Sequence, residues 1–458
     1  MKNSKVTMEK LVNHCKNMGI IFPGSEIYGG LANSWDYGPI GVELKNNIKN
    51  AWWKKFVWDS ENSQGVDTSI LMNPKVWEAS GHLASFTDPL MDCRQCKTRH
   101  RADKLIEAHT KNQVNADAMS NAEMEKYIIS NKIPCPRCGN SDFTPIRQFN
   151  LMFETNRGVT KESTNTIYLR PETAQGEFVN FLNVQRSLRL KVPFGIGQIG
   201  KAFRNEITPG NFTFRTIEFE QMEHQWFCKQ GTDEKYYNFY KNYSMEFLTS
   251  LGLPQEKLRF KDHDKLAHYA KSACDVQYEF MMGWDEINGI HNRTDFDLSR
   301  HQEFSGKSME YLDPITNEKF IPYIIEASYG LDRIILAILD NALDIEILED
   351  GTEREVLKFK PSIAPIKLAV LPLIKKTHGE KAREIFNNLK SKFKCIYDDT
   401  GSIGKRYRRE DAIGTPFCLT VDDNSLTNGT VTIRHRDSMA QETISIGEIQ
   451  NFIQQYLN

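Results

Sequence analysis

Hydrophobic residues near the start of the chain recur three and four positions apart over residues 42–57, with Trp52 and Trp53 among them. This spacing places them on one face of an amphipathic helix. The turn-rich segment before it ends in Gly38-Pro39, and proline suits the first turn of a helix. The pattern predicts a long helix that follows this entry.

The middle of the chain carries short apolar and aromatic runs between glycine, proline and charged turns, with few helical patterns among them. Such runs are typical of strands, and their succession predicts an antiparallel sheet. The predicted strands are 149–153, 166–169, 194–199 and 212–225, and the predicted helices are 174–190 and 236–251. Residues 287–298 and 321–343 add a further strand and an apolar helix.

The last hundred residues alternate regularly between strand and helix patterns. Two prolines in 361–365 mark the boundary. Strands are predicted at 367–373, 395–399, 417–421 and 430–434, and helices at 379–393, 404–413 and 446–457. The alternation predicts a separate α/β domain over 361–458.

Residues 93–148 differ from their surroundings, being polar and rich in lysine, with a cysteine pair towards each end and a helical run at 122–129. They are predicted to form an inserted module. The main domain then comprises residues 1–92 and 149–360, and a chain of 458 residues has room for two or three such units.

Composition is that of an ordinary globular protein, with 40% apolar and 26% charged residues. The formal net charge of -2 gives no overall attraction to a polyanion, so a nucleic acid would have to bind a local basic face. The start of the chain lacks the apolar stretch of a signal peptide, and no run approaches the ~18 apolar residues of a membrane span. We expect a cytoplasmic protein without a membrane partner.

Four of the nine cysteines form two Cys-x-x-Cys pairs, Cys93/Cys96 and Cys135/Cys138. Two such pairs can supply four thiolates to a structural Zn²⁺. The second pair is followed by Gly139, which eases the turn, whereas the first has no such glycine. Reduced thiols in a decayed site and a redox pair remain the alternatives to zinc.

A predicted hairpin carries an arginine on each arm, Arg204 and Arg215, with Phe219 four residues beyond the second. Arginine binds phosphate with a planar fork and keeps its charge, and an aromatic ring can stack on a nucleotide base. Further along, Gly330 permits a tight turn into an apolar helix whose first turn contains Arg333. These features indicate an ATP site, although a surface hairpin with arginine–glutamate pairs would show the same residues.

Phe203-Arg204-Asn205-Glu206 with Phe219 resembles motif 2 of the class II aminoacyl-tRNA synthetases, and Gly330-Leu331-Asp332-Arg333 resembles their motif 3. The helix after Pro39 resembles motif 1, which implies a homodimer. The segment 170–176, Arg-Pro-Glu-Thr-Ala-Gln-Gly, is similar to one characteristic of the dimeric glycyl-tRNA synthetases, and 365–458 is similar to their anticodon-binding domain. The resemblance implies an α+β protein: an antiparallel-sheet catalytic domain with flanking helices, a zinc-ribbon-like insertion and a C-terminal α/β domain.

The resemblance also implies roles for individual residues. Arg204 would contact the α-phosphate of ATP, Arg215 and Arg333 the outer phosphates, Phe219 the adenine ring and Glu206 its amino group. Glu286 would hold ATP through Mg²⁺. The residues expected to bind ATP are Arg204, Asn205, Glu206, Phe214, Arg215, Phe219, Glu286, Ile287, Gly330, Asp332 and Arg333. Of these, Arg204, Glu206, Arg215 and Arg333 are expected to be catalytic.

Glycine has no side chain, so selectivity must come from excluding anything larger. By resemblance, carboxylates and a serine surround its ammonium group. The expected glycine-binding residues are Arg101, Glu172, Glu220, Gln221, Glu223, Arg293, Glu326 and Ser328. For Arg101 and Arg293, an ordinary ion pair is an equally good interpretation.

The expected function is that of a glycine–tRNA ligase with ATP, glycine and tRNA-Gly as substrates. A class II enzyme for serine, threonine or proline and a non-catalytic RNA-binding paralogue are the alternatives. The basic run 405–409 is a candidate RNA contact or a solvated helix face, and His263, His268, His291 and His301 are expected to be surface or core residues, not ligands.

Overall fold

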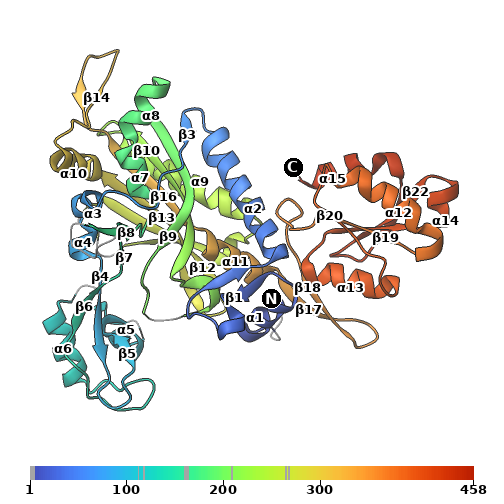
Figure 1. The fold of residues 1–458 in the computed structure, drawn as a ribbon, viewed down its shortest axis with the longest axis horizontal. Coiled ribbons are helices and arrows are strands. Elements are labelled where there is room, and N and C mark those ends of the chain that lie inside the picture. Colours follow the sequence, from blue (N-terminus) through green and yellow to red (C-terminus); the bar gives the residue numbers. More distant parts are fainter. Residues whose placement is uncertain are drawn as a thin grey trace.

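A computed structural model describes residues 6–111, 113–116, 119–158, 165–207, 210–263, 266 and 269–457. His268 lies outside the described residues. Figure 1 shows a central body, a small module at the lower left that comes from the first third of the chain, and a separate body at the right formed by the last hundred residues. No helix in the described part is long and apolar enough to cross a membrane.

The central body is built on a seven-stranded sheet of order β11-β12-β13-β16-β10-β9-β3, in which only the β3–β9 pair is parallel. The antiparallel sheet expected from the sequence is therefore confirmed. Its strands are β3 (Ser63–Gly65), β9 (Phe194–Phe203), β10 (Glu218–Cys228), β11 (Leu258–Asp262), β12 (Ser272–Phe280), β13 (Gly283–Thr294) and β16 (Tyr323–Gly330).

Helices cover both faces of this sheet. The largest apolar core includes Trp52, Met222 and Ile335 and joins one face to three helices. A second core, with Phe178, Phe181 and Phe227, covers part of the other face and leaves the rest open. The helices on the first face are α2 (Pro39–Trp53), which is continued by a π turn (Lys54–Trp58), α9 (Asp233–Ser250) and α11 (Leu331–Ala342). The helices on the other face are α7 (Ala174–Val179), α8 (Phe181–Leu188) and α10 (Phe296–Ser305).

The small module has its own three-stranded sheet of order β5-β4-β6 and its own core around Met91, Ile106 and Ile128. Ser120 and Glu123 form a capping box at the start of its second helix, which satisfies amides that a helix start leaves free. Its elements are β4 (Thr87–Asp92), β5 (Arg99–Arg101), α5 (Ala102–His109), α6 (Asn121–Ser130) and β6 (Arg147–Asn150).

The C-terminal body is a five-stranded sheet of order β20-β19-β21-β22-β23, parallel in its first three strands and antiparallel in the rest. Four strands and three helices follow the predicted alternation. The elements are β19 (Leu368–Pro372), α12 (Lys375–Leu389), β20 (Cys395–Tyr397), α13 (Ile403–Ile413), β21 (Phe417–Val421), α14 (Asp423–Thr427), β22 (Thr430–His435), β23 (Gln441–Ser445) and α15 (Ile449–Leu457).

Short elements complete the chain. The hairpin of β17 and β18 connects the central and C-terminal bodies and packs against α13. These elements are α1 (Met8–Asn17), β1 (Ile21–Pro23), η1 (Glu26–Tyr28), β2 (Trp35–Tyr37), α3 (Lys75–Ala79), α4 (His82–Ser85), β7 (Phe153–Asn156), β8 (Thr166–Leu169), η5 (Phe212–Phe214), η6 (Gln255–Lys257), β14 (Tyr311–Leu312), β15 (Lys319–Phe320), β17 (Leu343–Ile347), β18 (Glu353–Leu357) and η7 (Ile446–Glu448).

Candidate active site

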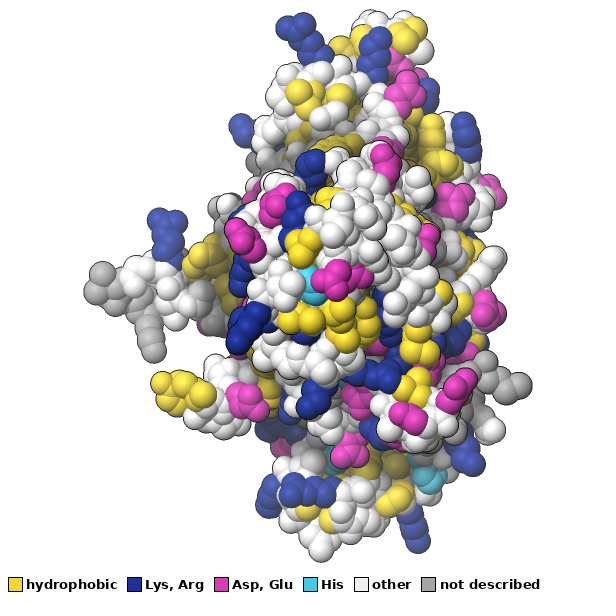
Figure 2. Space-filling model, turned by 90° about the vertical axis from the view of Figure 1, so that its right-hand side faces the viewer, with side chains coloured by type: hydrophobic (Ala, Val, Ile, Leu, Met, Phe, Trp, Pro, Cys, Tyr) yellow, Lys and Arg dark blue, Asp and Glu magenta, His cyan; other side chains and the backbone are white. Residues whose placement is uncertain are grey.

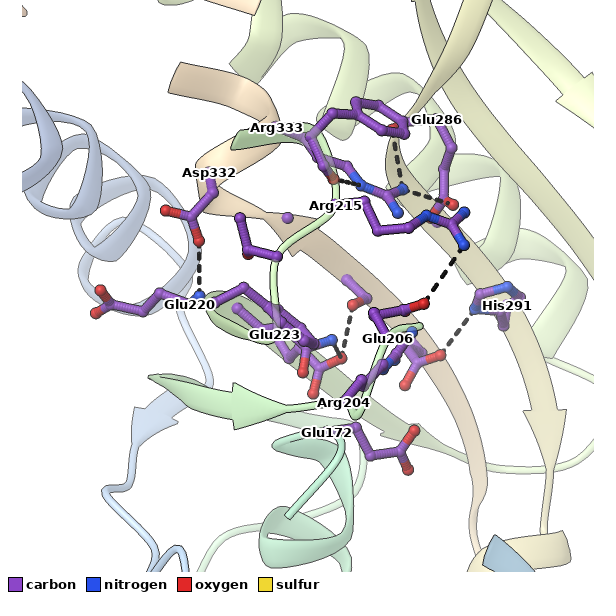
Figure 3. Close-up of a pocket in the computed structure, with 18 of the residues that line it drawn as sticks. Glu172, Arg204, Glu206, Arg215, Glu220, Glu223, Glu286, His291, Asp332 and Arg333 are labelled. Atoms are coloured by element: carbon purple, nitrogen blue, oxygen red, sulfur yellow. Dashed lines mark hydrogen bonds and ion pairs between the residues drawn. The ribbon is translucent and has the colours of Figure 1, made fainter. Parts of the chain in front are cut away.

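A cavity of about 200 Å³ opens on the uncovered part of the sheet. Its walls come from β10, β13 and β16, from the loop before β10 and from the start of α11. In Figure 3, Arg333 and Arg215 lie at one end of the cavity and Glu172 at the other. It is lined by Glu172, Arg204, Glu206, Thr213, Phe214, Arg215, Thr216, Phe219, Glu220, Gln221, Glu223, Tyr269, Glu286, Gly289, His291, Arg293, Glu326, Ser328, Gly330, Asp332 and Arg333.

Three arginines line the cavity, and each is held by a ring or a carboxylate. Arg215 and Arg333 lie at the end opposite Glu172, whereas Arg204 lies beside Glu172 and donates to the Pro171 carbonyl at 3.1 Å. The Arg204 guanidinium lies over the Phe219 ring, 5.3 Å from its centroid. Arg215 pairs with Glu206 at 3.5 Å. Both pairs join residues that the hairpin pattern had placed on facing arms, so the hairpin forms one wall of a cavity and not a free surface.

Arg333 lies in the first turn of α11, as the sequence predicted. Its guanidinium donates to Glu286 Oε2 at 3.0 Å and lies over the Phe214 ring, 4.4 Å from the centroid. Burial disfavours charge on Glu286, but the charge and the hydrogen bond of Arg333 hold the pKa of its carboxyl below the usual range. A fixed cation and a carboxylate therefore face each other where polyphosphate and a divalent ion could bind.

Strand register brings the acidic residues together. Glu223 is opposite Ser328, which is opposite Gly289. Glu326 pairs in the same way with His291 on β13. Because side chains alternate between the faces of a strand, residues two apart on β10 and β16 point into the same cavity.

Glu223 is the least readily ionised of the lining carboxylates. Burial and the neighbouring charges of Glu326 and Glu172 raise the pKa of Glu223 to about 7, although hydroxyl groups stabilise its anion. The Ser328 hydroxyl donates to Glu223 Oε1 at 2.6 Å, and the Thr173 hydroxyl donates to the other oxygen. A cation of small size would relieve the repulsion among these carboxylates.

The groups that face Glu326 and Glu172 lower the pKa values of both carboxyls. Burial acts against ionisation of Glu326, but the charge of Arg293 and a hydrogen bond with His291 lower its pKa to about 2. For Glu172, burial is likewise outweighed by His82, whose ring lies 3.4 Å away, and the pKa falls well below the usual range. Sequence reasoning had not assigned His82 or His291 to the site, since isolated histidines carry no spacing signal.

Glu177 is a buried carboxyl behind the cavity that the sequence analysis missed. It is fully buried on α7, and neither of its oxygens has a hydrogen-bond partner among the described residues. Burial and the charges of Glu223 and Glu326 raise the pKa of Glu177 well above its usual value. It follows directly on the segment 170–176, and that position is the one signal that could have identified it.

The assignment of Glu220 to the glycine pocket needs correction. Its carboxylate turns to the opposite side of β10 (Figure 3) and pairs with Lys45 at 3.0 Å and Lys49 at 2.6 Å on α2. Asp332 points the same way, accepting hydrogen bonds from Tyr37 at 2.5 Å and from the Glu220 amide at 2.8 Å. Strand alternation explains this, because a neighbour of Gln221 on β10 must face the other side.

Three of the expected residues do not line the cavity. Arg101 pairs with Asp88 at 3.0 Å and with Asp103 at 2.5 Å, the ordinary ion pair that the sequence left open. Ile287 belongs to the main apolar core, and Asn205 donates its amide to the Leu151 carbonyl. Arg293, by contrast, lines the cavity and pairs with Glu326 and Asp297.

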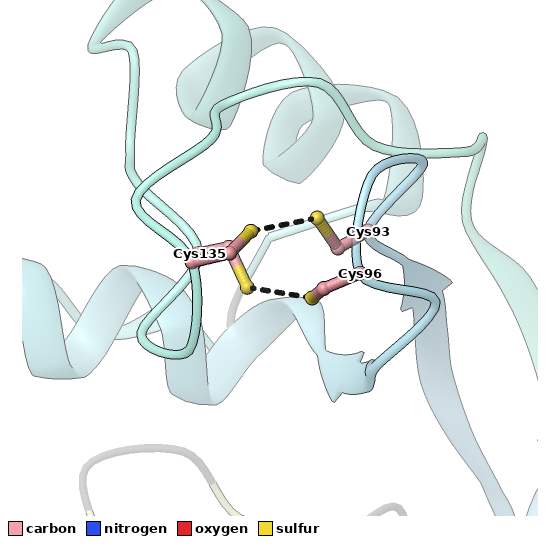
Figure 4. Close-up of side chains that lie close together, drawn as sticks. Cys93, Cys96 and Cys135 are labelled. Carbon is pink, nitrogen blue, oxygen red and sulfur yellow. Dashed lines mark hydrogen bonds between the residues drawn. The ribbon is translucent and has the colours of Figure 1, made fainter.

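The four cysteines of the inserted module converge on one point (Figure 4). Sγ of Cys93 lies 3.6 Å from that of Cys138, and Sγ of Cys96 lies 3.7 Å from that of Cys135. Thiolates held about 2.3 Å from a tetrahedral Zn²⁺ lie about 3.8 Å apart. The cluster is thus compatible with zinc.

Both cysteine turns are built alike, although one lacks glycine. Gly139 has φ +76° and donates to the Cys135 carbonyl at 2.8 Å; Lys97 has φ +60° and donates to the Cys93 carbonyl at 2.9 Å. The left-handed residue that closes a knuckle is a lysine in the first pair. This substitution explains why its sequence signal was weaker.

Residues 153–342 match the family model of the tRNA synthetase class II core domain (G, H, P, S and T), and residues 367–456 match that of the anticodon binding domain. The chain is 58% identical to the glycine–tRNA ligase of Clostridium acetobutylicum, with 99% of each chain covered. It is also 58% identical to that of Geobacillus thermodenitrificans, over 98% of this chain and 97% of the relative.

The chain belongs to the glycine–tRNA ligase family. Its similarity to these glycine–tRNA ligases extends over nearly the whole length, through both the class II core and the anticodon-binding domain. The family and fold class expected from the sequence are confirmed. The cavity described above lies within the class II core that this glycine–tRNA ligase family shares.

Proposed function

We infer that this protein charges tRNA-Gly with glycine in two steps. The glycine carboxylate attacks the α-phosphorus of ATP, so that glycyl-adenylate forms and pyrophosphate leaves. The 3′-terminal ribose hydroxyl of the tRNA then attacks the carbonyl of the adenylate and AMP leaves. The observation that carries the proposal is one small cavity with Arg215 and Arg333 at one end and Glu172 at the other, lined also by Arg204 and by the buried carboxyls of Glu223 and Glu326.

Phosphate binding is proposed for the three arginines of the cavity. Arg204 would contact the α-phosphate and Arg215 and Arg333 the outer phosphates, where negative charge spreads in the transition state. Phe219 would stack on adenine, and Glu206 would accept a hydrogen bond from its amino group. Glu286 would hold Mg²⁺, which would neutralise phosphate charge. Catalysis would come from positioning and charge stabilisation, without a covalent enzyme intermediate.

Glycine binding is proposed for the acidic end. Glu223, Glu326 and Glu172 would surround the ammonium group, and Ser328, whose hydroxyl bonds Glu223, would keep the floor of the pocket rigid. Arg293 supports this arrangement through its 3.2 Å pair with Glu326. A larger amino acid would have to displace groups that are already paired, and that cost would exclude it.

We propose that the Cys93, Cys96, Cys135 and Cys138 thiolates hold a structural Zn²⁺ that stabilises the inserted module. The support is the sulfur separations of 3.6 and 3.7 Å. All nine cysteines are free thiols, which also supports a reducing, cytoplasmic location.

We propose that the active form is a homodimer. The short helix η1 and the loop after it expose apolar side chains: Ile27 is 88% exposed, Tyr28 86% and Leu31 59%. A contiguous apolar surface of this kind is typical of an interface. Replacing Ile27 and Tyr28 by glutamate should give a monomer in light scattering, whereas Ile315→Glu, at an equally exposed position on another surface, should stay dimeric.

The C-terminal domain is proposed to bind the tRNA anticodon. Figure 2 shows that basic side chains are spread over its outer face among acidic ones and do not form one basic field. Within the run 405–409, Arg406 is buried and donates to the Pro372 carbonyl at 2.5 Å, and Tyr407 bonds Thr420. Lys405 and Arg409 are exposed and remain candidates for RNA contact, although Arg409 also pairs with Asp398.

The deciding experiment is pyrophosphate exchange into ATP with each standard amino acid in turn, with Mg²⁺ and without tRNA. Exchange with glycine alone is expected. Exchange with serine, threonine or proline would keep the reaction class and overturn the substrate. No exchange from a folded protein that binds tRNA would favour the non-catalytic alternative.

A further inference from the structure

Three neighbouring strands of the central sheet bring two histidines and an aspartate to one edge of the cavity. His263 follows β11 and donates its amide to the Ala273 carbonyl at 3.1 Å, and Ala273 is opposite His291 on β13. Asp275 lies two residues beyond Ala273 on β12, so it faces the same side. One ligand atom from each of His263, Asp275 and His291 lies within 4.8 Å of the others.

The arrangement of these side chains is specific. His263 Nε2 lies 2.7 Å from an Asp275 carboxylate oxygen, and the two imidazole centroids are 5.8 Å apart. The methyl group of Ala273 leaves room between the two rings. A side chain on Gly289 would approach His291 Cε1 to 2.9 Å, so glycine is needed there for the ring to take this position.

His291 is oriented by a carboxylate on its far side. Its Nδ1 lies 2.7 Å from Glu326 Oε2 (Figure 3). A carboxylate only accepts, so Nδ1–H is the donor of this bond, and in the neutral ring Nε2 then carries the lone pair. Histidine ligands of metal ions typically donate their other ring N–H to a carboxylate in this way.

We propose that His263 Nε2, the Asp275 carboxylate and His291 Nε2 form a binding site for a divalent transition-metal ion of the zinc type. Two imidazoles and one carboxylate are a common donor set for such ions. Mg²⁺ prefers oxygen donors, so this site differs in chemistry from the Mg²⁺ position proposed at Glu286. The nearby Glu286 and Glu326 carboxylates add negative charge that favours a cation.

The site is separate from the four-cysteine cluster and goes beyond the proposed function. Since His291 lines the cavity and bonds Glu326, an ion held there would fix one tautomer of His291 and the position of Glu326. Binding requires loss of the proton that joins His263 to Asp275. Because His291 bonds Glu326, the geometry of the acidic end of the cavity would depend on whether a metal ion is bound at this site.

The test uses untagged full-length protein stripped of metal and titrated with Co²⁺, without nucleotide. Thiolate-bound Co²⁺ gives intense charge-transfer bands, whereas nitrogen and oxygen ligands give only weak visible bands. We expect two equivalents, one of each kind. Binding of a single thiolate-type equivalent by the wild-type protein would overturn the proposal.

Variants identify the residues that bind the second equivalent of Co²⁺. His291→Ala and Asp275→Asn should each weaken it more than about tenfold and leave the thiolate bands unchanged. His435→Gln is the matched control, because His435 also pairs with a carboxylate, Glu442 at 2.6 Å, but in the C-terminal domain. Melting temperatures check folding, and either variant suffices if the other fails to fold. An unchanged second equivalent in a folded variant would overturn the assignment.

Discussion

The charge of the cavity depends on the pKa values of its individual carboxyl groups. Glu223, Glu326 and Glu172 share one small space, yet only Glu223 has its pKa raised, to about 7. Glu326 faces Arg293 and Glu172 faces His82, whereas Glu223 has hydroxyl partners without charge. The three side chains are of one type, and their neighbours make them differ.

Glycine capture should therefore depend on pH through Glu223. An ionised Glu223 attracts the ammonium group, so kcat/KM for glycine in pyrophosphate exchange should rise with pH and level off above about pH 7. One unit below that pKa it should be about tenfold lower than the plateau. In Glu223→Gln this step should disappear. A pH-independent wild-type kcat/KM between pH 6 and 8 would contradict the assignment.

Glu177 should make the protein less stable as pH rises. Its folded-state pKa is raised above the unfolded value, so its contribution is fully present below about pH 4.5 and is lost towards higher pH. Between the two pKa values the loss is about 1.4 kcal/mol per pH unit. Urea unfolding from pH 5 to 8 should show this slope in the wild type and a smaller one in Glu177→Gln.

The control is Glu234→Gln, which changes an exposed carboxyl on α9 and should leave the slope as it is. Equal slopes in the wild type and Glu177→Gln would mean that Glu177 is ionised in the folded protein.

At the scale of elements, backbone conformation decides how the cysteine turns form. Lys97 and Gly139 occupy equivalent left-handed positions in two hydrogen-bonded turns. Left-handed backbone costs a residue with a side chain about 1–2 kcal/mol and costs glycine little. Sequence reasoning recognised the glycine turn and underrated the lysine turn, because the latter is specified by its cysteines and hydrogen bonds.

Exchanging these residues should change zinc affinity in opposite directions. Lys97→Gly should tighten zinc binding and Gly139→Ala should weaken it, each by about 1 kcal/mol, or about fivefold. A Cβ at Gly139 would meet no atom within 4 Å, so backbone strain alone is tested. Competition with a chelator measures the affinities. A shift in the same direction for both variants would contradict the argument.

At the scale of the whole molecule, a buried ion cluster joins the C-terminal domain to the central body. Asp411 on α13 accepts from Arg354 on β18 at 2.9 Å and from Arg434 on β22 at 2.8 Å. Arg354 and Asp411 are fully buried. Removing one member leaves a buried charge without its partner, which is costly.

Asp411→Ala should loosen the C-terminal domain by about 3–5 kcal/mol and leave the cavity in place. Pyrophosphate exchange with glycine should be retained, whereas KM for tRNA in aminoacylation should rise. Hydrogen exchange should increase in the β17–β18 hairpin and α13. Asp437→Ala, which removes a largely exposed partner of Arg436, should have little effect. Equal loss of pyrophosphate exchange and of aminoacylation would show that the cluster supports the whole fold.

Hydrophobic periodicity determined the class of the fold, because it directly records which face of each element is buried. It was sufficient for the C-terminal alternation, for α2 and for the antiparallel sheet. Local motifs identified Arg204, Arg215, Arg333 and the four cysteines, since fixed spacing survives without tertiary information. Contacts between distant residues decided the rest: strand alternation turned Glu220 towards Lys45, and sheet register brought His291 to Glu326. Charged neighbours then separated the pKa values of identical carboxyl groups, which no sequence pattern encodes.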